Sequence, residues 1–292
     1  MTARGWWRPV LGLARVDQKL LWRDRQLLVA TWGIPLAYLA LLPQIVHGSA
    51  GTGVPYSHFL VAGTVAVAVV SGTYSNLAIA LPALREILVL KRLRGTPLTT
   101  AQLALGKLLS LGATTGGNIV LVVVAGRLGY GVPLPVEPVT FLLFVALGVV
   151  VFSVIGVAFA SLVRSPQAAV PLVQLPYVGL QFVSGVFFPV RSMPGWAQTV
   201  AGVLPLRGLV DGLRAGYLGT DAEHGRRLAG VFEPQHFGLV TSVTSQSRGL
   251  LVLVVWALVG LQVARGRFRW ERRSTSAASA ARPATNPYPA HT

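Results

Sequence analysis

Long apolar segments recur along the 292-residue chain, and they constrain its fold more than any other feature. An apolar segment of about 20 residues can cross the hydrocarbon core of a bilayer as a helix. Backbone polar groups inside a bilayer must bond to one another, so helices are the natural form for such segments. We therefore predict an all-α polytopic membrane protein with six transmembrane helices. Their approximate ranges are residues 27–46, 58–81, 103–125, 139–163, 168–188 and 245–264.

Composition and charge agree with this fold class. Hydrophobic residues make up 53% of the chain and charged residues only 12%, and the mean hydropathy is +0.61. The net charge of +16 could indicate nucleic-acid binding. The basic residues, however, gather beside membrane segments, at both ends of the chain and around Arg85, as the positive-inside rule predicts. We therefore set nucleic acid aside and expect a multi-pass protein of the plasma membrane (bacterial inner membrane), with both termini cytoplasmic.

The chain divides into three parts. Residues 1–26 form a cytoplasmic tail with a basic amphipathic helix, residues 27–264 form the transmembrane domain, and residues 265–292 form a basic, disordered cytoplasmic tail. Paired tryptophans, Trp6 and Trp7, and leucines at helical spacing favour an N-terminal helix lying in the plane of the inner membrane surface. The alternative is an untethered basic tail.

A basic amphipathic segment separates the second predicted span from the third. Between Arg85 and Arg94, arginine and lysine are interspersed with leucine and isoleucine at helical spacing, so one side can rest on lipid or protein. Pro97 ends this helix, because the residue before a proline is disfavoured in the α region. Thr99 and Gln102 form a capping-box pattern that starts the next helix. The charge pattern alone fits either a simple cytoplasmic anchor or a docking element.

The same segment reads KRLRGTPL over residues 91–98, preceded by Arg85-Glu86 and Leu90. It resembles the cytoplasmic loop motif of the ABC-2 type export permeases, the daunorubicin-resistance-like drug exporters especially. The resemblance implies a coupling helix that docks on a separate ABC ATP-binding subunit. It also implies a complex of two permeases, identical or related, with two ATPases that bind the ATP and Mg. The residues so assigned to ATPase coupling are Arg85, Glu86, Leu90, Lys91, Arg92, Leu93, Arg94, Thr96 and Pro97.

A second motif region, residues 184–219, resembles the outer-face signature of the same family, and the resemblance implies extracellular re-entrant helices before the last span. Arg207, Asp211 and Arg214 fall on one side of such a helix and its leucines on the other. Asp211 can then pair with both arginines, and we interpret the three as a solvated charge face rather than substrate contacts. The residues that carry the resemblance include Phe187, Phe188, Pro189, Pro205, Asp211 and Arg214.

Polar residues inside two predicted spans are candidates for a translocation path or a dimer seam. The second span contains a polar cluster with Ser71, Tyr74 and Asn76, which lipid would not favour. The fifth span contains Gln174 and Gln181 in a glutamine series of seven-residue spacing. Both sets could line a path between the first, second and fifth spans, or could join helices by hydrogen bonds. The sequence leaves both interpretations open.

Catalytic and metal-binding patterns are not evident. The predicted spans have no carboxylate pair, metal-binding helix or nucleophile elbow, and Gly106-Lys107 lacks the rest of a phosphate-binding loop. We therefore expect a transport subunit, not an enzyme, that binds no cofactor or metal directly and depends on a partner to hydrolyse ATP. With the resemblance, this predicts an exporter of an amphiphilic drug, antibiotic or lipid-like substrate. The alternatives are an ion-coupled secondary carrier or channel, and a membrane-embedded enzyme.

Overall fold

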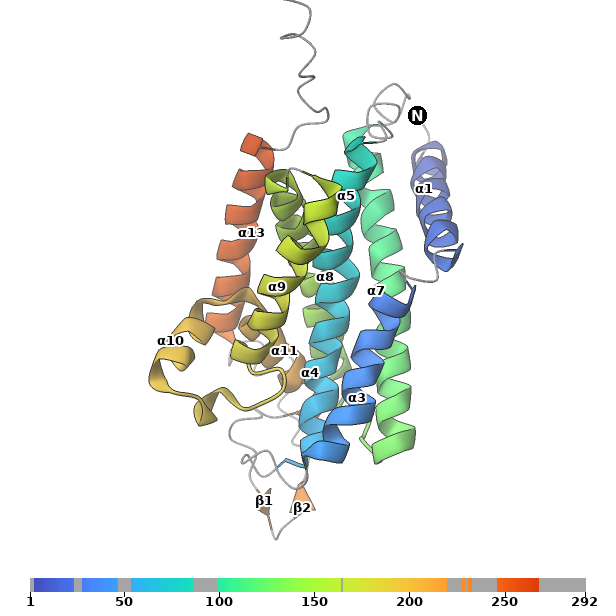
Figure 1. The fold of residues 1–292 in the computed structure, drawn as a ribbon. Coiled ribbons are helices and arrows are strands. Elements are labelled where there is room, and N and C mark those ends of the chain that lie inside the picture. The colour runs from blue at the N-terminus through green and yellow to red at the C-terminus, as the bar shows by residue number, and fades with distance from the viewer. Residues whose placement is uncertain are drawn as a thin grey trace, which may run out of the picture.

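The computed structural model describes residues 3–23, 28–46, 54–86, 99–163, 165–219, 227–228, 231–232 and 246–267, which form a helical bundle (Figure 1). The part of the chain described contains two short strands in addition to helices. The elements are α1 (Ala3–Arg23), η1 (Val29–Gly33), α3 (Ile34–Ile45), α4 (Tyr56–Val70), η2 (Ser71–Ser75), α5 (Asn76–Glu86), α7 (Thr100–Tyr130), α8 (Pro138–Leu162), α9 (Pro166–Val183), η3 (Val190–Ser192), α10 (Gly195–Val203), α11 (Pro205–Leu218), β1 (Arg227–Leu228), β2 (Val231–Phe232) and α13 (Ser247–Arg267).

Four helical segments in the described ranges are long and apolar enough to cross a membrane. They are Tyr56–Glu86, Ala101–Tyr130, Pro138–Leu162 and Ser247–Gly266. They correspond to the second, third, fourth and sixth predicted spans, so the fold is that of a multi-pass membrane protein. The segments predicted as first and fifth spans are also helical, as η1 with α3 and as α9. α9 contains three glutamines and three prolines among its 18 residues.

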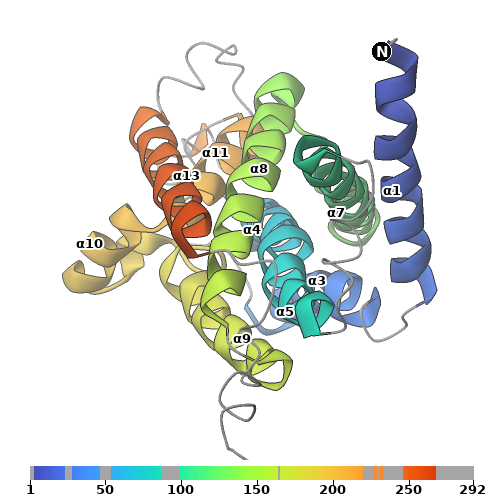
Figure 2. The same cartoon turned by 90° about the horizontal axis from the view of Figure 1, so that it is seen from above.

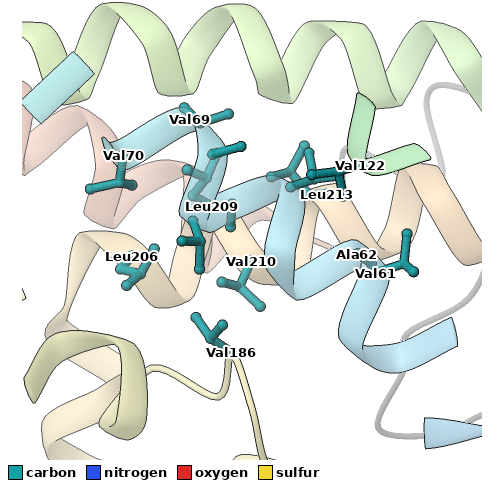
Figure 3. Close-up of a cluster of buried hydrophobic side chains, with 14 of the residues drawn as sticks. Val61, Ala62, Val69, Val70, Val122, Val186, Leu206, Leu209, Val210 and Leu213 are labelled. Atoms are coloured by element: carbon teal, nitrogen blue, oxygen red, sulfur yellow. The ribbon is translucent and has the colours of Figure 1, made fainter. Parts of the chain in front are cut away.

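Helix α4 forms the centre of the bundle. Every residue from Phe59 to Ser75 is buried, although an ordinary surface helix buries only one face. α3, α7, α8 and α11 all pack against α4, and Figure 2 shows it among its neighbours in the view along the bundle. Valines and an alanine of α4 lie close to the leucines of α11 in Figure 3. Its burial on all sides from Phe59 onward makes α4 the element on which the other helices assemble.

Helix α1 packs beside α7 and lies across the bundle. Figure 2 shows α1 along its length where α7 is seen close to its axis. Asp17 of α1 forms a 2.8 Å ion pair with Lys107 of α7, and the Gln18 amide donates to the Ser110 carbonyl at 2.6 Å. The predicted capping box is confirmed: Thr99 accepts from the backbone of Gln102, whose side chain accepts in turn from the Thr99 backbone. Helix α1 is therefore fastened to α7 by an ion pair and a hydrogen bond.

Helices α10 and α11 lie toward one end of the bundle, whereas α1, the end of α5 and the end of α13 lie toward the other (Figure 1). Helix α11 is amphipathic but almost wholly buried, because α4, α8 and α13 all contact it. The two strands pair antiparallel, Arg227 with Phe232 and Leu228 with Val231. The second motif region thus contains helices α10 and α11, at the end of the bundle opposite α1.

Candidate functional site

The polar cluster of the second span coincides with a change in helix type. Ser71–Ser75 form the π-helical turn η2 between α4 and α5, and such turns often occur at functional sites because the extra residue displaces the backbone bonds. Helices α7, α8 and α9 all contact η2. The Tyr74 ring centroid lies 5.6 Å from that of Phe159 in α8 and 6.2 Å from that of Tyr177 in α9. The centre of the bundle is thus a junction of helices around a local irregularity.

Some hydrogen bonds at this junction stay within one helix, and another joins two helices. The Ser71 and Thr73 hydroxyls donate to carbonyls of their own helix, at 3.2 and 2.6 Å. The Tyr177 hydroxyl instead donates across helices to the Val67 carbonyl at 3.0 Å. Asn76 follows the turn and is half-buried. The bond between helices therefore comes from Tyr177, which the sequence interpretation did not single out, while the Ser71 and Thr73 hydroxyls bond within their own helix.

The glutamines of α9 differ strongly in exposure. Gln181 is 1% exposed, Gln174 is half-buried and Gln167 is exposed. In the described part of the chain, the Gln181 Oε1 atom has no hydrogen-bond partner. A buried amide oxygen without a partner costs about 1–3 kcal/mol. Gln181 therefore stands out as the polar group at the inner face of α9 that the packing leaves unsatisfied.

The first residues of the predicted coupling motif lie at the end of α5. Arg85 is half-buried, and its Nη1 donates to the Ala160 carbonyl at 3.0 Å. Ala160 lies in the last turn of α8, where carbonyls lack partners within the helix and a cation is favourable. Glu86 is exposed beside it. The remaining residues of the motif, Leu90 to Pro97, lie outside the residues that the structure describes.

The second motif region is built around buried aromatic and proline residues. Phe187 is 3% exposed, with its ring centroid 5.0 Å from that of Tyr38 in α3. Phe188 is 42% exposed. Pro189 and Pro205 are buried, and Pro205 begins α11, where a proline has no backbone hydrogen bond to lose. The segment after α9 is thereby held between α3 and α11.

Arg214 contradicts the interpretation of a solvated charge face. It is 3% exposed, and its Nη2 donates to the carbonyls of Gly185 at 2.7 Å and Val186 at 3.1 Å. Its guanidinium carbon lies 3.6 Å from the centroid of the Phe59 ring. Two carbonyls and an aromatic face replace the water that a solvated arginine would have. The prediction for Asp211 is confirmed in its pairing with Arg207, whose Nε donates to it.

Sequence reasoning missed the glycines that allow α11 to be buried. Gly208, Gly212 and Gly216 recur every four residues, a spacing that places small residues on one face of a helix. A Cβ atom at Gly208 would lie 2.6 Å from the Gly249 carbonyl of α13, and one at Gly216 would lie 2.5 Å from the Phe141 backbone nitrogen of α8. The four-residue glycine spacing was visible in the sequence and could have predicted this close packing.

Among the residues that the structure describes, no group of three histidine, cysteine or acidic side chains could hold a metal ion. The described structure is instead that of a multi-pass helical membrane protein with polar groups buried at its centre and a cation buried toward one end.

Residues 10–218 match the ABC-2 type transporter family, and the chain belongs to that family. It is also 32% identical over 186 residues to nodulation protein J of Rhizobium meliloti strain 1021, an alignment that covers 59% of this chain and 66% of the relative. The aligned part is thus slightly less than two thirds of that protein. Members of this family are transmembrane subunits that generally work with an ABC ATP-binding subunit. The chain is accordingly a transmembrane subunit of an ABC transporter.

Proposed function

We propose that this chain is the permease subunit of an ATP-driven exporter that moves an amphiphilic drug, antibiotic or lipid-like molecule out across the plasma membrane. Two copies, or this chain and a related permease, would form the pathway with two ATPases, which bind the ATP and Mg. Family membership supports the transport role. The cargo class is supported by the spans themselves, which are apolar and poor in charge.

The observation that carries the proposed mechanism is the continuity of the helix from Tyr56 to Glu86. Its outer part, α4, is the buried centre of the bundle, and its other end is Glu86, where the coupling motif begins. Arg85 ties that end to α8. A push on the motif would therefore travel along α5 to η2, where a π-helical turn can change its hydrogen bonding more easily than a regular helix can. Tyr74 and Tyr177 would respond there.

A six-span topology follows if α3 with η1 and α9 also cross the bilayer. An even number of crossings brings both termini to one side, and α1 and the end of α13 lie toward the same end of the bundle (Figure 1). The basic residues in and after α1 and after α13 support a cytoplasmic position for that side. Residues 1–26, 27–264 and 265–292 would then be the cytoplasmic helix, the transmembrane domain and the cytoplasmic tail. α10 and α11 would be re-entrant elements at the outer face.

Docking of the ATPase can be tested by copurification. The tagged protein is purified from its host in mild detergent, after crosslinking, and copurified proteins are identified by mass spectrometry. Glu86→Ala and Leu90→Glu are compared with Arg265→Gln, an exposed charge at the same end of the bundle. We expect an ATPase with Walker motifs to copurify with the unmodified protein and the Arg265 variant. Leu90→Glu should lose it, because a carboxylate would replace an apolar docking contact.

Glu86→Ala should remain inserted in the membrane and lose substrate-stimulated ATP hydrolysis, since the exposed carboxylate would no longer meet its partner. Equal ATPase recovery and equal stimulation in both coupling variants would refute the docking assignment. Failure to recover any ATPase after crosslinking would refute the exporter proposal itself and favour a carrier that works alone.

A further inference from the structure

A short stretch of α7, residues 114–118 with the sequence TTGGN, lies where α1, η1 and η2 all meet this helix. Figure 2 shows α7 between α1 and the helix formed by α4 and α5. The polar residues of the stretch are buried: Thr114 is 4% exposed, and Thr115 and Asn118 are 0% exposed. Buried polar side chains usually have bonding partners, so the contacts of this stretch indicate what it holds in place.

The end of the stretch holds the π-helical turn of the first predicted span. The Asn118 Nδ2 atom donates to the Thr31 carbonyl of η1 at 2.8 Å. The next residue of η1, Trp32, lies so near Gly117 that an added Cβ would be 3.3 Å from the indole ring. A π-helical turn interrupts the regular hydrogen-bond ladder of a helix. A bond donated from a neighbouring helix therefore stabilises one arrangement of this turn.

The same stretch contacts the second π-helical turn. A Cβ atom added at Gly72 of η2 would lie 2.4 Å from the Thr115 Oγ1 atom, so glycine alone fits without displacing Thr115. Residues 115 and 118 are three positions apart and are neighbours on the surface of α7. Both π-helical turns of the described residues, η1 and η2, therefore rest on one turn of α7.

Helix α1 also reaches this stretch. The Gln18 Nε2 atom donates to the Thr114 Oγ1 atom at 2.8 Å. The Trp22 ring centroid of α1 lies 5.3 Å from that of Trp32 in η1, in an edge-to-face arrangement. α1 thus contacts η1 directly and also contacts the part of α7 that holds it. A displacement of α1 would act on both.

Stability alone does not account for an asparagine at position 118. Its Oδ1 atom has no hydrogen-bond partner among the described residues, and a buried amide oxygen in that state costs free energy. An apolar side chain of similar size would avoid this cost, but it could not donate to Thr31. The donated bond is what Asn118 contributes here, and it fixes the position of the η1 backbone.

We propose that residues 114–118 of α7 hold η1 and η2 in one joint arrangement, with Asn118 as the positioning residue, so that the two π-helical turns change together. Because η1 belongs to the first predicted span and η2 to the second, this stretch sets how the two spans lie relative to each other. Two irregular turns that share one tightly packed support behave as a single switching element. The proposal depends on neither the cargo nor the ATPase.

Hydrogen–deuterium exchange of the full-length protein in lipid nanodiscs, read by mass spectrometry, tests this link. Asn118→Leu removes the bond to η1, and exchange is followed in both turns. Gly72→Ala is the reciprocal variant, because it crowds Thr115 from the side of η2. Tyr130→Phe is the matched control. The Tyr130 hydroxyl also donates from α7 to the first predicted span, to the Leu39 carbonyl at 3.0 Å, but from the last residue of α7.

We expect Asn118→Leu to raise exchange roughly fivefold or more in η1 and in η2, as the loss of one buried hydrogen bond implies. Gly72→Ala should likewise raise exchange in both turns, because coupling between two sites is reciprocal. Exchange in α10 and α13 should stay unchanged, and Tyr130→Phe should leave both turns as they are. Asn118→Ser, which also removes the amide, serves if Asn118→Leu does not fold.

A rise confined to the turn beside each substitution would overturn the joint arrangement of η1 and η2. A rise of similar size throughout the protein, α10 and α13 included, would overturn the positioning role, because it would show a general loss of stability. An equal effect of Tyr130→Phe on both turns would show that any bond between α7 and the first span suffices, and would overturn the assignment to residues 114–118.

Discussion

Replacement of Arg214 tests whether a buried cation holds the segment after α9 against the centre of the bundle. The guanidinium joins three parts of the chain: α11, from which it comes, the carbonyls of Gly185 and Val186, and the Phe59 ring of α4. Arg214→Leu removes all of these contacts. Phe59→Leu removes the aromatic face and keeps an apolar side chain.

Two opposing effects determine the magnitude for Arg214→Leu. Two buried carbonyls lose a charged donor, at about 1–3 kcal/mol each, and loss of a desolvated cation–π contact adds about 1–2 kcal/mol. Removal of the buried charge recovers a desolvation penalty of several kcal/mol, which cancels part of this loss. We expect a net destabilisation of about 2 kcal/mol, because the two buried carbonyls lose a donor that leucine cannot replace.

A double-mutant cycle that combines Arg214→Leu with Phe59→Leu isolates the interaction between the guanidinium and the ring. The desolvation of Arg214 cancels, because it contributes equally with and without the Phe59 ring. Unfolding in mixed micelles, followed by tryptophan fluorescence, should give a coupling energy of about 1–2 kcal/mol between Arg214→Leu and Phe59→Leu. Arg265→Leu, at an exposed position, should change stability by less than about 0.5 kcal/mol. A coupling energy near zero, with Arg214→Leu as mild as the control, would show that the buried guanidinium does not hold these segments together.

Two further predictions concern packing and the path. Gly216→Ala should destabilise the protein by about 1–2 kcal/mol, because overpacking against the Phe141 backbone outweighs the gain in helix propensity. Gly112→Ala, with no atom within 4 Å of the added Cβ, should be neutral or stabilise it by up to about 1 kcal/mol in the same unfolding assay. Gln174→Leu with Gln181→Leu should alter substrate selectivity in vesicle transport if these side chains line the path; unchanged transport with altered dimer stability would favour helix packing.

The sequence predicts this fold well where the physics is local. The lengths of the apolar segments predicted where the long helices lie, because a bilayer span needs a nearly fixed number of residues. Thr99 and Gln102 located the start of α7 because a capping box needs only three residues of spacing. The predicted third span ended near residue 125, whereas α7 continues to Tyr130 and ends at Gly131, whose φ of 65° suits glycine. Span length therefore underestimates a helix that extends beyond its apolar part.

The sequence could not reveal what depends on several distant segments. Arg214 has the spacing of a charged helix face with Arg207 and Asp211, and only the approach of Gly185 and Phe59 makes it a buried residue. The π-helical turn is equally hidden, since Ser71–Ser75 mark polarity but not the backbone change. Burial of a charge depends on which carbonyls and rings surround it, and these come from other elements.

The continuous helix formed by α4, η2 and α5 links Glu86 mechanically to the segment after α9. Among the described residues, a route from Glu86 to Val186 runs through tightly packed elements. α5 is tied to α8 by Arg85, α4 is buried from Phe59 to Val70, and Gly63 of α4 is so close to the Val186 carbonyl that an added Cβ would lie 2.5 Å from it. Tight packing transmits displacement because cores have few voids to absorb it. The π-helical turn at η2 is the irregular backbone along this route. A displacement that starts at Glu86 and reaches the segment after α9 must therefore either change η2 or move α4 and α5 as one rigid body.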